Sequence, residues 1–294
     1  MIKQLLALVT ITFLLLSLTL NSISYANMNN NNNSSEKNVT NIVHDMKTGQ
    51  TSYEEISLEN IDYSKGKINN DPSRIITPWD NPSDGRIQIT NTTDSPYRNF
   101  CRVEATFSDN VVYTASGVLV DFDVVLTAAH VIYRHDNNVG WATSVRVIPG
   151  KYGNSEPLGD TYSTNITSNV AYINNIDHNY DWAMIDLQDS FSTFQLYGYY
   201  SDYSGLSGTW IEAYGYPNYI TPPNVLYKST STIVSSTDGL ITHICDVTDG
   251  QSGGPVLDFM TDYLVGINSY ETTYYNYACR INQDLYGRIV AHCQ

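Results

Sequence analysis

Short strand-like stretches separated by turn residues are the feature that most constrains the fold of this 294-residue chain. Each stretch is rich in β-branched and aromatic residues, and Gly, Asn, Asp and Pro stand between them. Strands do not alternate with long helical patterns, and only residues 284–293, with Leu285 and Ile289 on one side, favour a helix. The pattern predicts an all-β sandwich or barrel. The expected strands are 100–107, 111–120, 123–130, 144–150, 181–187, 208–216, 225–234, 239–247 and 263–269.

The N-terminus has the layout of a secretory signal peptide. Lys3 precedes an apolar run over residues 5–20, and Ser24 and Ala26 occupy the small-residue positions of a cleavage site. A membrane anchor is the alternative, but the run is shorter than the ~20 residues that span a bilayer. We therefore predict a signal peptide over residues 1–26 and a secreted, extracellular protein without a membrane anchor.

Residues 27–74 differ in character from the rest of the chain. The segment opens with a low-complexity run of asparagines and stays polar up to Arg74, so it lacks the apolar residues that build a core. We interpret it as a propeptide that is mostly disordered. A disordered surface tail is an alternative that composition leaves open. Residues 75–294 then form the folded part.

Charge and cysteine content narrow the class of protein. The formal net charge is −15, and such a surface repels phosphate backbones, which argues against nucleic acid as a partner. The cysteines form no Cys-x-x-Cys pair, so we predict neither a metal site nor a cofactor. An even number in a secreted chain suggests two disulfides, with three possible connectivities. The four cysteines are Cys101, Cys245, Cys279 and Cys293.

The segment GQSGG, residues 250–254, places Ser252 between glycines, as nucleophile turns of several hydrolase folds do. An α/β-hydrolase would need a histidine after the serine and a helix directly behind it. His292 is the only later histidine, and Gly-Gly-Pro is a poor start for a helix. A purely structural serine in a glycine turn is a second alternative.

Partners upstream of the serine offer a third interpretation. His130 ends an apolar stretch, Asp181 opens another, and the order His, Asp, Ser on a strand-rich chain is that of a two-barrel protease. The imidazole would take the serine proton, and the carboxylate would hold the imidazole tautomer. The N–H groups of Gly250 and Ser252 would form the oxyanion hole. The competitors in the same region are His178, Asp177 and Asp186.

The motifs TAAH (127–130) and GQSGGP (250–255) resemble those of the chymotrypsin-like serine peptidases. More narrowly, the chain resembles the bacterial glutamyl endopeptidases. The resemblance covers about residues 75–290 and rests on blocks in the same order, over 85–98, 149–157, 179–187, 197–217 and 246–256.

This resemblance implies a trypsin-like fold of two six-stranded antiparallel β-barrels, over about 86–190 and about 195–283, with a C-terminal helix. It implies a monomeric serine endopeptidase that hydrolyses protein or peptide substrates through an acyl-enzyme. The triad would be His130, Asp181 and Ser252.

Activation and specificity depart from the family pattern. Gln251 replaces the aspartate that binds the new N-terminal amine in trypsin-like zymogens. We expect an activating protease, or self-cleavage, near Arg74. As in the glutamyl endopeptidases, the freed amine of Ile75 would lie near the specificity pocket and attract an acidic substrate side chain.

In the pocket itself, the resemblance places Val247 and Asn268 where the family carries a threonine and a histidine. Neither side chain supplies a positive charge, so the preference for an acidic residue before the scissile bond is weakened. Thr248 or Ser269 could compensate, whereas Asp246 leaves a basic or relaxed preference as the alternative.

By the same resemblance, Cys245 would pair with Cys279 beside the specificity site, which leaves Cys101 for Cys293. A hypothesis of a different class is a non-catalytic binding protein on the same fold.

Overall fold

The computed structural model describes residues 38–59, 61, 85–192 and 206–293. The expected signal peptide, Arg74 and Ile75 lie outside these residues. Within the described ranges, no helix is long and apolar enough to span a bilayer.

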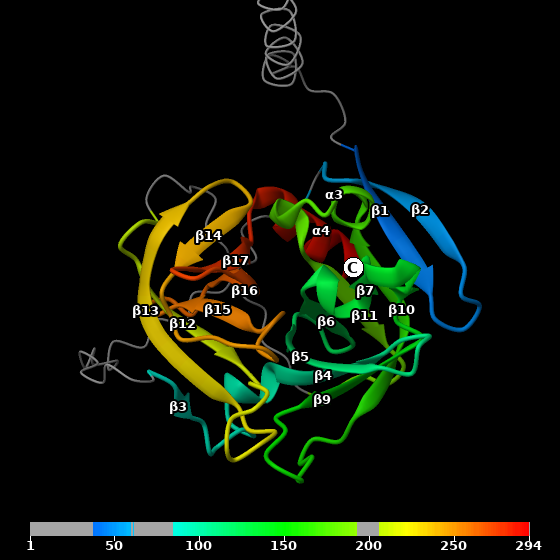
Figure 1. Cartoon of the computed structure of the whole chain (residues 1–294). Helices are drawn as coiled ribbons and strands as arrows, with labels where there is room; N and C mark the ends of the chain where they lie inside the picture. The colour runs from blue at the N-terminus through cyan, green and yellow to red at the C-terminus, as the bar shows by residue number, and fades with distance from the viewer. Residues whose placement is uncertain (1–37, 60, 62–84, 193–205, 294) are drawn as a thin grey trace, which may run out of the picture. The chain divides into compact units, whose positions relative to one another are not determined.

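A closed barrel of antiparallel strands forms most of the first sheet (Figure 1). Its order is β11-β6-β5-β4-β9-β10, and β10 pairs back with β11 to close the barrel. Apolar side chains such as Val103, Leu119 and Ile185 fill the interior. The strands are β4 (Phe100–Thr106), β5 (Val112–Leu119), β6 (Val124–Thr127), β9 (Ser144–Pro149), β10 (Thr161–Asn169) and β11 (Ala183–Leu187).

The second sheet closes in the same way, in the order β12-β15-β16-β17-β14-β13, with β12 paired to β13. Ile211, Ile233 and Val265 lie in its interior. The short strand β3 (Ile87–Gln88) is added to β13. The barrel strands are β12 (Trp210–Gly215), β13 (Tyr227–Ser236), β14 (Leu240–His243), β15 (Pro255–Asp258), β16 (Leu264–Glu271) and β17 (Asn276–Arg280).

Helices are few and short. The C-terminal helix α4 (Gln283–His292) begins where the Asn282 side chain accepts the N–H of Leu285 at 2.9 Å, a regular N-cap. The others are α2 (Ala129–Ile132), α3 (Val170–Asn175) and the 3₁₀ turns η1 (Tyr97–Asn99), η2 (Asp136–Asn138) and η3 (His178–Tyr180). A small ribbon pairs β7 (Tyr133–Arg134) with β8 (Gly140–Trp141).

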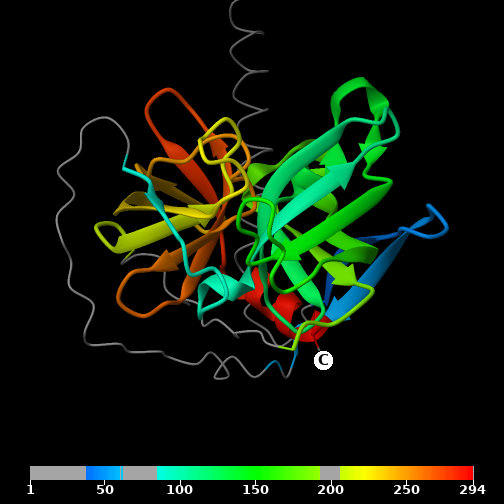
Figure 2. The ribbon, with the colours of Figure 1, turned by 90° about the horizontal axis from the view of Figure 1, so that it is seen from below.

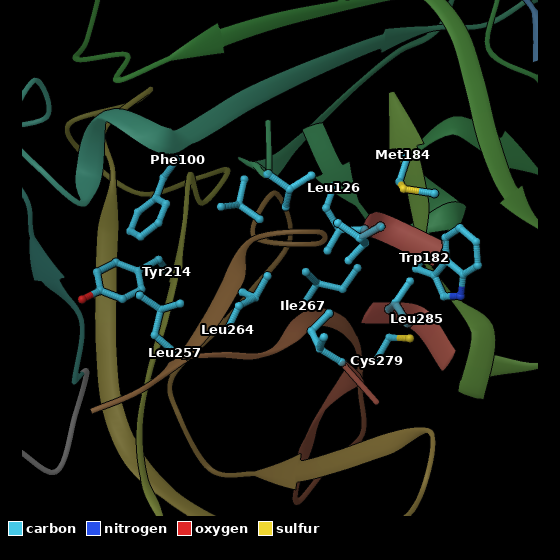
Figure 3. Packing of buried hydrophobic residues seen from close by; sticks show 14 of the residues in the cluster. Phe100, Leu126, Trp182, Met184, Tyr214, Leu257, Leu264, Ile267, Cys279 and Leu285 are labelled. Carbon is cyan, nitrogen blue, oxygen red and sulfur yellow. The ribbon is translucent and has the colours of Figure 1, made fainter. Parts of the chain in front are cut away.

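The two barrels share a third apolar core between them (Figure 3). Phe100 and Trp182 come from the first barrel region, Tyr214 and Ile267 from the second, and Leu285 from α4. The Phe100 and Tyr214 rings lie 4.8 Å apart, centroid to centroid, within the range of favourable aromatic pairs. This core holds the facing surfaces of the two barrels together. The expected two-barrel fold with a C-terminal helix is confirmed.

Residues 38–57 depart from the disorder expected for 27–74, whereas 27–37, 60 and 62–74 lie outside the described residues. Residues 38–57 form a hairpin of β1 (Asn38–Asp45) and β2 (Thr51–Ser57), and β1 pairs with β10 at the edge of the first barrel (Figures 1 and 2). Composition reflects the segment alone. The barrel edge supplies the hydrogen-bond partners and the apolar surface that the segment itself lacks.

The expected disulfides are also absent, because all four cysteines are free. Cys245 lies in the interior of the second barrel, whereas Cys279 lies in the core between the barrels. Cys101 belongs to the interior of the first barrel, and Cys293 packs against the core between the barrels. The members of each expected pair thus belong to different clusters.

Candidate active site

A buried carboxylate organises the interface between the barrels. Asp181 lies between η3 and β11 and is 0% exposed. Its Oδ2 accepts a hydrogen bond from His130 Nδ1 at 2.8 Å, and its Oδ1 accepts the His130 backbone N–H at 3.0 Å. The carboxylate therefore holds both the ring and the backbone of His130, at the start of α2, which has no side-chain cap of its own.

His130 and Asp181 each shift the pKa of the other. Burial alone would raise the pKa of Asp181, but the charge of His130 and the hydrogen bonds to the carboxylate outweigh burial and lower it. Burial would lower the pKa of His130, but the charge of Asp181 and its hydrogen bond raise it above the ordinary value. Because Asp181 can only accept, Nδ1 of a neutral His130 carries the proton and Nε2 is free to accept one.

The second barrel contributes a further partner to Asp181. The Ser269 hydroxyl, on β16, donates a hydrogen bond to Oδ2, the same oxygen that His130 uses. From the sequence, Ser269 is expected only as a substitute donor in the specificity pocket. Ser269 and Asp181 lie 88 residues apart, and no local motif signals their contact.

Ser252 lies in a turn that both barrels hold in place. Gly253 N–H donates to the Asn268 carbonyl at 2.7 Å within the second barrel, and Ser116 N–H of β5 donates to the Ser252 carbonyl at 2.9 Å. The Ser116 hydroxyl also donates to the Gly250 carbonyl at 2.8 Å. Within the described part of the chain, the Ser252 hydroxyl forms no hydrogen bond with His130, although the two residues line the same two pockets.

The peptide before Gly250 has a defined orientation. Asn218 N–H donates to the Asp249 carbonyl at 2.7 Å, and this peptide is trans. Because a trans peptide holds C=O and N–H in opposite directions, the Gly250 N–H points away from Asn218. Among the described residues, neither the Gly250 N–H nor the Ser252 N–H has an acceptor. Both are available to a negatively charged oxygen beside Ser252.

Two pockets meet at His130 and Ser252. The larger, of about 700 Å³, is lined by both barrels and includes Tyr113 and Asn218. The smaller, of about 240 Å³, is a candidate specificity pocket. Its other lining residues are Val247, Thr248, Asp249, Gln251, Asn268, Ser269, Tyr270, Glu271 and Tyr277.

The smaller pocket brings together Val247 and Asn268, as the sequence predicts. It contains two buried polar atoms without a hydrogen-bond partner among the described residues, Gln251 Nε2 and Asn268 Oδ1. No Lys or Arg belongs to its described lining. Asp246 is not part of the lining. Its carboxylate is solvent-exposed and accepts the N–H of Gly85, so it is not the buried, unpaired charge that would require a basic substrate.

The competing residues have other roles. The His178 ring packs 4.4 Å from the ring of Tyr270, centroid to centroid, and Asp177 accepts the N–H of Asn179. Asp186 accepts a hydrogen bond from His292. His178, Asp177 and Asp186 line neither pocket at Ser252. In the described part of the chain, no three His, Cys, Asp or Glu side chains gather where they could hold a metal ion.

Two closed barrels that share one site at their interface are the arrangement of the trypsin-like serine endopeptidases. The chain belongs to the trypsin family, which matches its residues 89–286.

Two curated relatives are bacterial proteases. The chain is 30% identical over 216 residues to the "Extracellular metalloprotease" of Bacillus subtilis (strain 168), a match that covers 70% of this chain and 67% of that protein. It is 32% identical over 178 residues to the "Glutamyl endopeptidase" of Bacillus licheniformis, which covers 60% of this chain and only 54% of that protein. The resemblance to glutamyl endopeptidases that the motifs suggested is thereby confirmed.

Solved structures show the same fold. A Glu endopeptidase in complex with MPD matches with a TM-score of 0.63 and 20% identity, over 72% of this chain and 97% of that one. The protease Anisep from Arthrobacter nicotinovorans matches with a TM-score of 0.55 and 19% identity, over 67% and 98%. An inactivated protease paralogue of the scabies mite matches with a TM-score of 0.50 and 14% identity, over 63% and 89%.

Proposed function

We propose that this protein is a secreted serine endopeptidase that cleaves protein or peptide substrates through an acyl-enzyme on Ser252. The observation that carries the proposal is the hydrogen bond between buried Asp181 and His130, which lines the same pockets as Ser252. A histidine held by a buried carboxylate beside a serine hydroxyl is what nucleophilic acyl transfer requires.

The reaction follows from the proton positions. Ser252 Oγ attacks the scissile carbonyl while His130 Nε2 takes its proton, and the resulting oxyanion receives the N–H groups of Gly250 and Ser252. His130 then returns the proton to the leaving amine, and the acyl-enzyme forms. Water, activated by the same imidazole, hydrolyses the ester. Asp181 stabilises the transient imidazolium at Nδ1 throughout.

A fluorophosphonate probe tests this proposal directly, because it modifies only an activated serine. We expect stoichiometric labelling of Ser252 in the processed protein and none in Ser252→Ala, whose turnover should fall about 10⁴- to 10⁶-fold. The rival hypothesis is a non-catalytic binding protein, and the scabies mite paralogue shows that this fold also occurs in an inactivated protease. An unlabelled, folded wild type would support that rival.

For the residue before the scissile bond we propose a preference for glutamate. The support is the relative named Glutamyl endopeptidase and Gln251 Nε2 in the smaller pocket, a donor without a partner among the described residues. The described lining offers no Lys or Arg, so the positive charge would come from the amine of Ile75, freed by cleavage after Arg74. One additional residue before Ile75 should then weaken activity.

A relaxed or basic preference is the second candidate, because the acidic residues Asp249 and Glu271 line the same pocket. Matched peptides that differ only in Glu, Gln, Lys or Leu before the scissile bond separate the candidates. A large advantage of Glu over its isostere Gln requires a positive charge in the pocket. Equal cleavage of Glu and Gln would instead indicate relaxed specificity, and an advantage of Lys would indicate the basic one.

Secretion and processing complete the proposal. The apolar N-terminal run and the word "extracellular" in the name of the Bacillus subtilis relative both support export. N-terminal sequencing of the protein from culture medium should find a start at residue 27 for the proform and at Ile75 for the processed chain. Full activity without any cut near Arg74 would contradict the processing step.

A further inference from the structure

The hairpin of residues 38–57 occupies an otherwise unpaired part of the first barrel. On one edge of β10, β9 pairs only with Thr161 and Tyr162 and then leaves the strand. β1 pairs with β10 beyond this point, from Asn41 opposite Asn169 to Asp45 opposite Asn165, while β11 pairs with the other edge. The hairpin thus covers backbone groups of β10 that the barrel does not pair with its own strands.

The hairpin also completes the packing behind the proposed catalytic histidine. Ile42 is 4% exposed and lies in one apolar cluster with Ala129, Tyr172 and Ile173. Ala129 immediately precedes His130 and begins α2. Loss of the hairpin would remove Ile42 from this cluster and expose the apolar side chains beside α2.

A buried cation of the C-terminal helix is bonded to β1. Arg288 of α4 is 5% exposed, and its Nη1 donates to the Thr40 carbonyl at 3.1 Å and to the Asn41 side chain. Its Nε donates to Asp284 at 2.9 Å. Without the hairpin, Nη1 of a buried guanidinium would lose both acceptors, and unmade hydrogen bonds of a buried charge are costly.

The hairpin has its own turn chemistry and a further contact to the barrel. The Asp45 side chain accepts the N–H groups of Lys47 and Thr48, which closes the loop between β1 and β2. The His44 ring stacks on Trp141 with centroids 5.0 Å apart. Residues 38–57 therefore behave as an ordered element with a specific seat.

We propose that this hairpin is a permanent second chain of the mature enzyme. Resting on the cleavage proposed above, hydrolysis of the Arg74–Ile75 peptide bond adds one water and leaves a carboxylate on Arg74 and an amine on Ile75. β1 lies N-terminal to this cut, whereas its partners β10, α2 and α4 lie C-terminal to it. The contacts between them are non-covalent and do not depend on the peptide bond that is cut. The processed fragment stays bound as a structural subunit that supports His130, rather than leaving as an inhibitor.

Native mass spectrometry of the active, processed enzyme tests the proposal. We expect a one-to-one complex of the catalytic chain with a fragment that contains residues 38–57, and protected backbone N–H groups over 165–169 in hydrogen exchange. An enzyme that consists of residues 75–294 alone, with full activity and unchanged Tm, would overturn it.

The cleavage and the retention can fail separately. If no cut occurs near Arg74, the processing proposal is wrong, but retention can still be measured. A site for a specific protease is then inserted between residues 62 and 74 of Ser252→Ala, the protein is cut, and size-exclusion chromatography shows whether the fragment co-elutes.

A matched pair of hairpin variants shows whether the seat is the one described. In the cut protein, Ile42→Asp places a charge in the buried cluster and should speed release of the fragment at least about tenfold. Tyr53→Asp introduces the same charged residue at the position opposite Ile42 in the hairpin. The Tyr53 side chain is 64% exposed, so this variant should leave release unchanged. Equal release rates for the two variants would contradict the proposed seat.

Discussion

The Ser116 hydroxyl of the first barrel donates a hydrogen bond to the Gly250 carbonyl, in the second barrel's serine turn, at 2.8 Å. The same hydroxyl oxygen accepts the Tyr216 N–H at 2.8 Å. The Ser116 N–H meanwhile holds the Ser252 carbonyl at 2.9 Å. One buried residue therefore fixes the turn of the proposed nucleophile relative to the barrel that carries His130.

Ser116→Ala should lower kcat about tenfold and reduce Tm. The change leaves the buried Tyr216 N–H without its acceptor and the Gly250 carbonyl without this donor, at a cost of about 1–3 kcal/mol. Ser108→Ala removes a solvent-exposed hydroxyl from the same barrel and serves as the control. A Ser116→Ala enzyme with the wild-type kcat would show that the turn does not need this contact.

The sequence predicts strands well where apolar residues alternate and poorly where burial involves polar residues. All nine expected stretches contain strands, but the barrel strands β15, β17 and β10 were not expected. β10 shows why such a strand is missed. Its sequence TYSTNITSN contains one strongly apolar residue, Ile166, although Thr167 and Ser168 are fully buried. Those two residues pair with Val43 and Ile42 of the hairpin, so the same contact accounts for β10 and for the unexpected hairpin.

The sequence also predicts some residues of the site and misses others. His130, Asp181 and Ser252 were recognised because each is part of a local motif. Ser116 and Ser269 carry no local signal, because their partners lie 134 and 88 residues away along the chain. The expected disulfides failed for a related reason, since an even cysteine count says nothing about which core each thiol enters.

The raised pKa of His130 predicts the pH dependence of catalysis. The imidazole must be neutral to accept the Ser252 proton, so kcat/KM should rise with pH through a midpoint above ~6.5. Asp181→Asn removes the charge that raises this pKa, while burial, which lowers it, remains. The midpoint should move to lower pH and kcat should fall about 10⁴-fold. A midpoint that does not move would mean that Asp181 does not set the pKa of His130.

The raised pKa of His130 also determines the direction in which stability changes with pH. Because the folded pKa of His130 exceeds its unfolded value, the ion pair's contribution is complete below ~pH 6.5. It is lost as pH rises through the folded pKa. Thermal unfolding of the wild type and Asp181→Asn across this range should show their difference in Tm shrinking as pH rises.

Ser269→Ala tests the contribution of the second barrel to Asp181. The hydroxyl bond is one of the causes that lower the pKa of this carboxyl, and a hydrogen bond to a charged group is worth about 1.5–3 kcal/mol. We expect a loss of stability of that size and a clear fall in kcat, measured by denaturant unfolding and steady-state kinetics. Ser235→Ala, at an exposed position of β13, should change neither.

Thiol counting checks the four free cysteines. Alkylation of the denatured, unreduced protein should modify all four, whereas two disulfides would leave none reactive. In the native protein the reaction should be slow, because burial raises the pKa of Cys245 to about 12 and suppresses the reactive thiolate.

Gly250→Ala tests whether catalysis depends on the orientation of the Gly250 N–H. Gly250 has φ +91°, and a Cβ built there would lie 2.6 Å from the Tyr216 carbonyl oxygen and 2.7 Å from the Asn218 nitrogen. The turn must shift away from the Asn218 contact that orients the N–H, so kcat should fall about 10²- to 10³-fold, the scale for one oxyanion donor. Gly208→Ala separates this effect from backbone strain, because Gly208 has φ +84° but no described residue within 4 Å of its Cβ position. Gly208→Ala should lower Tm through strain of about 1–2 kcal/mol and keep the wild-type kcat. Similar kcat values for both variants would mean that the position of this N–H does not limit the reaction.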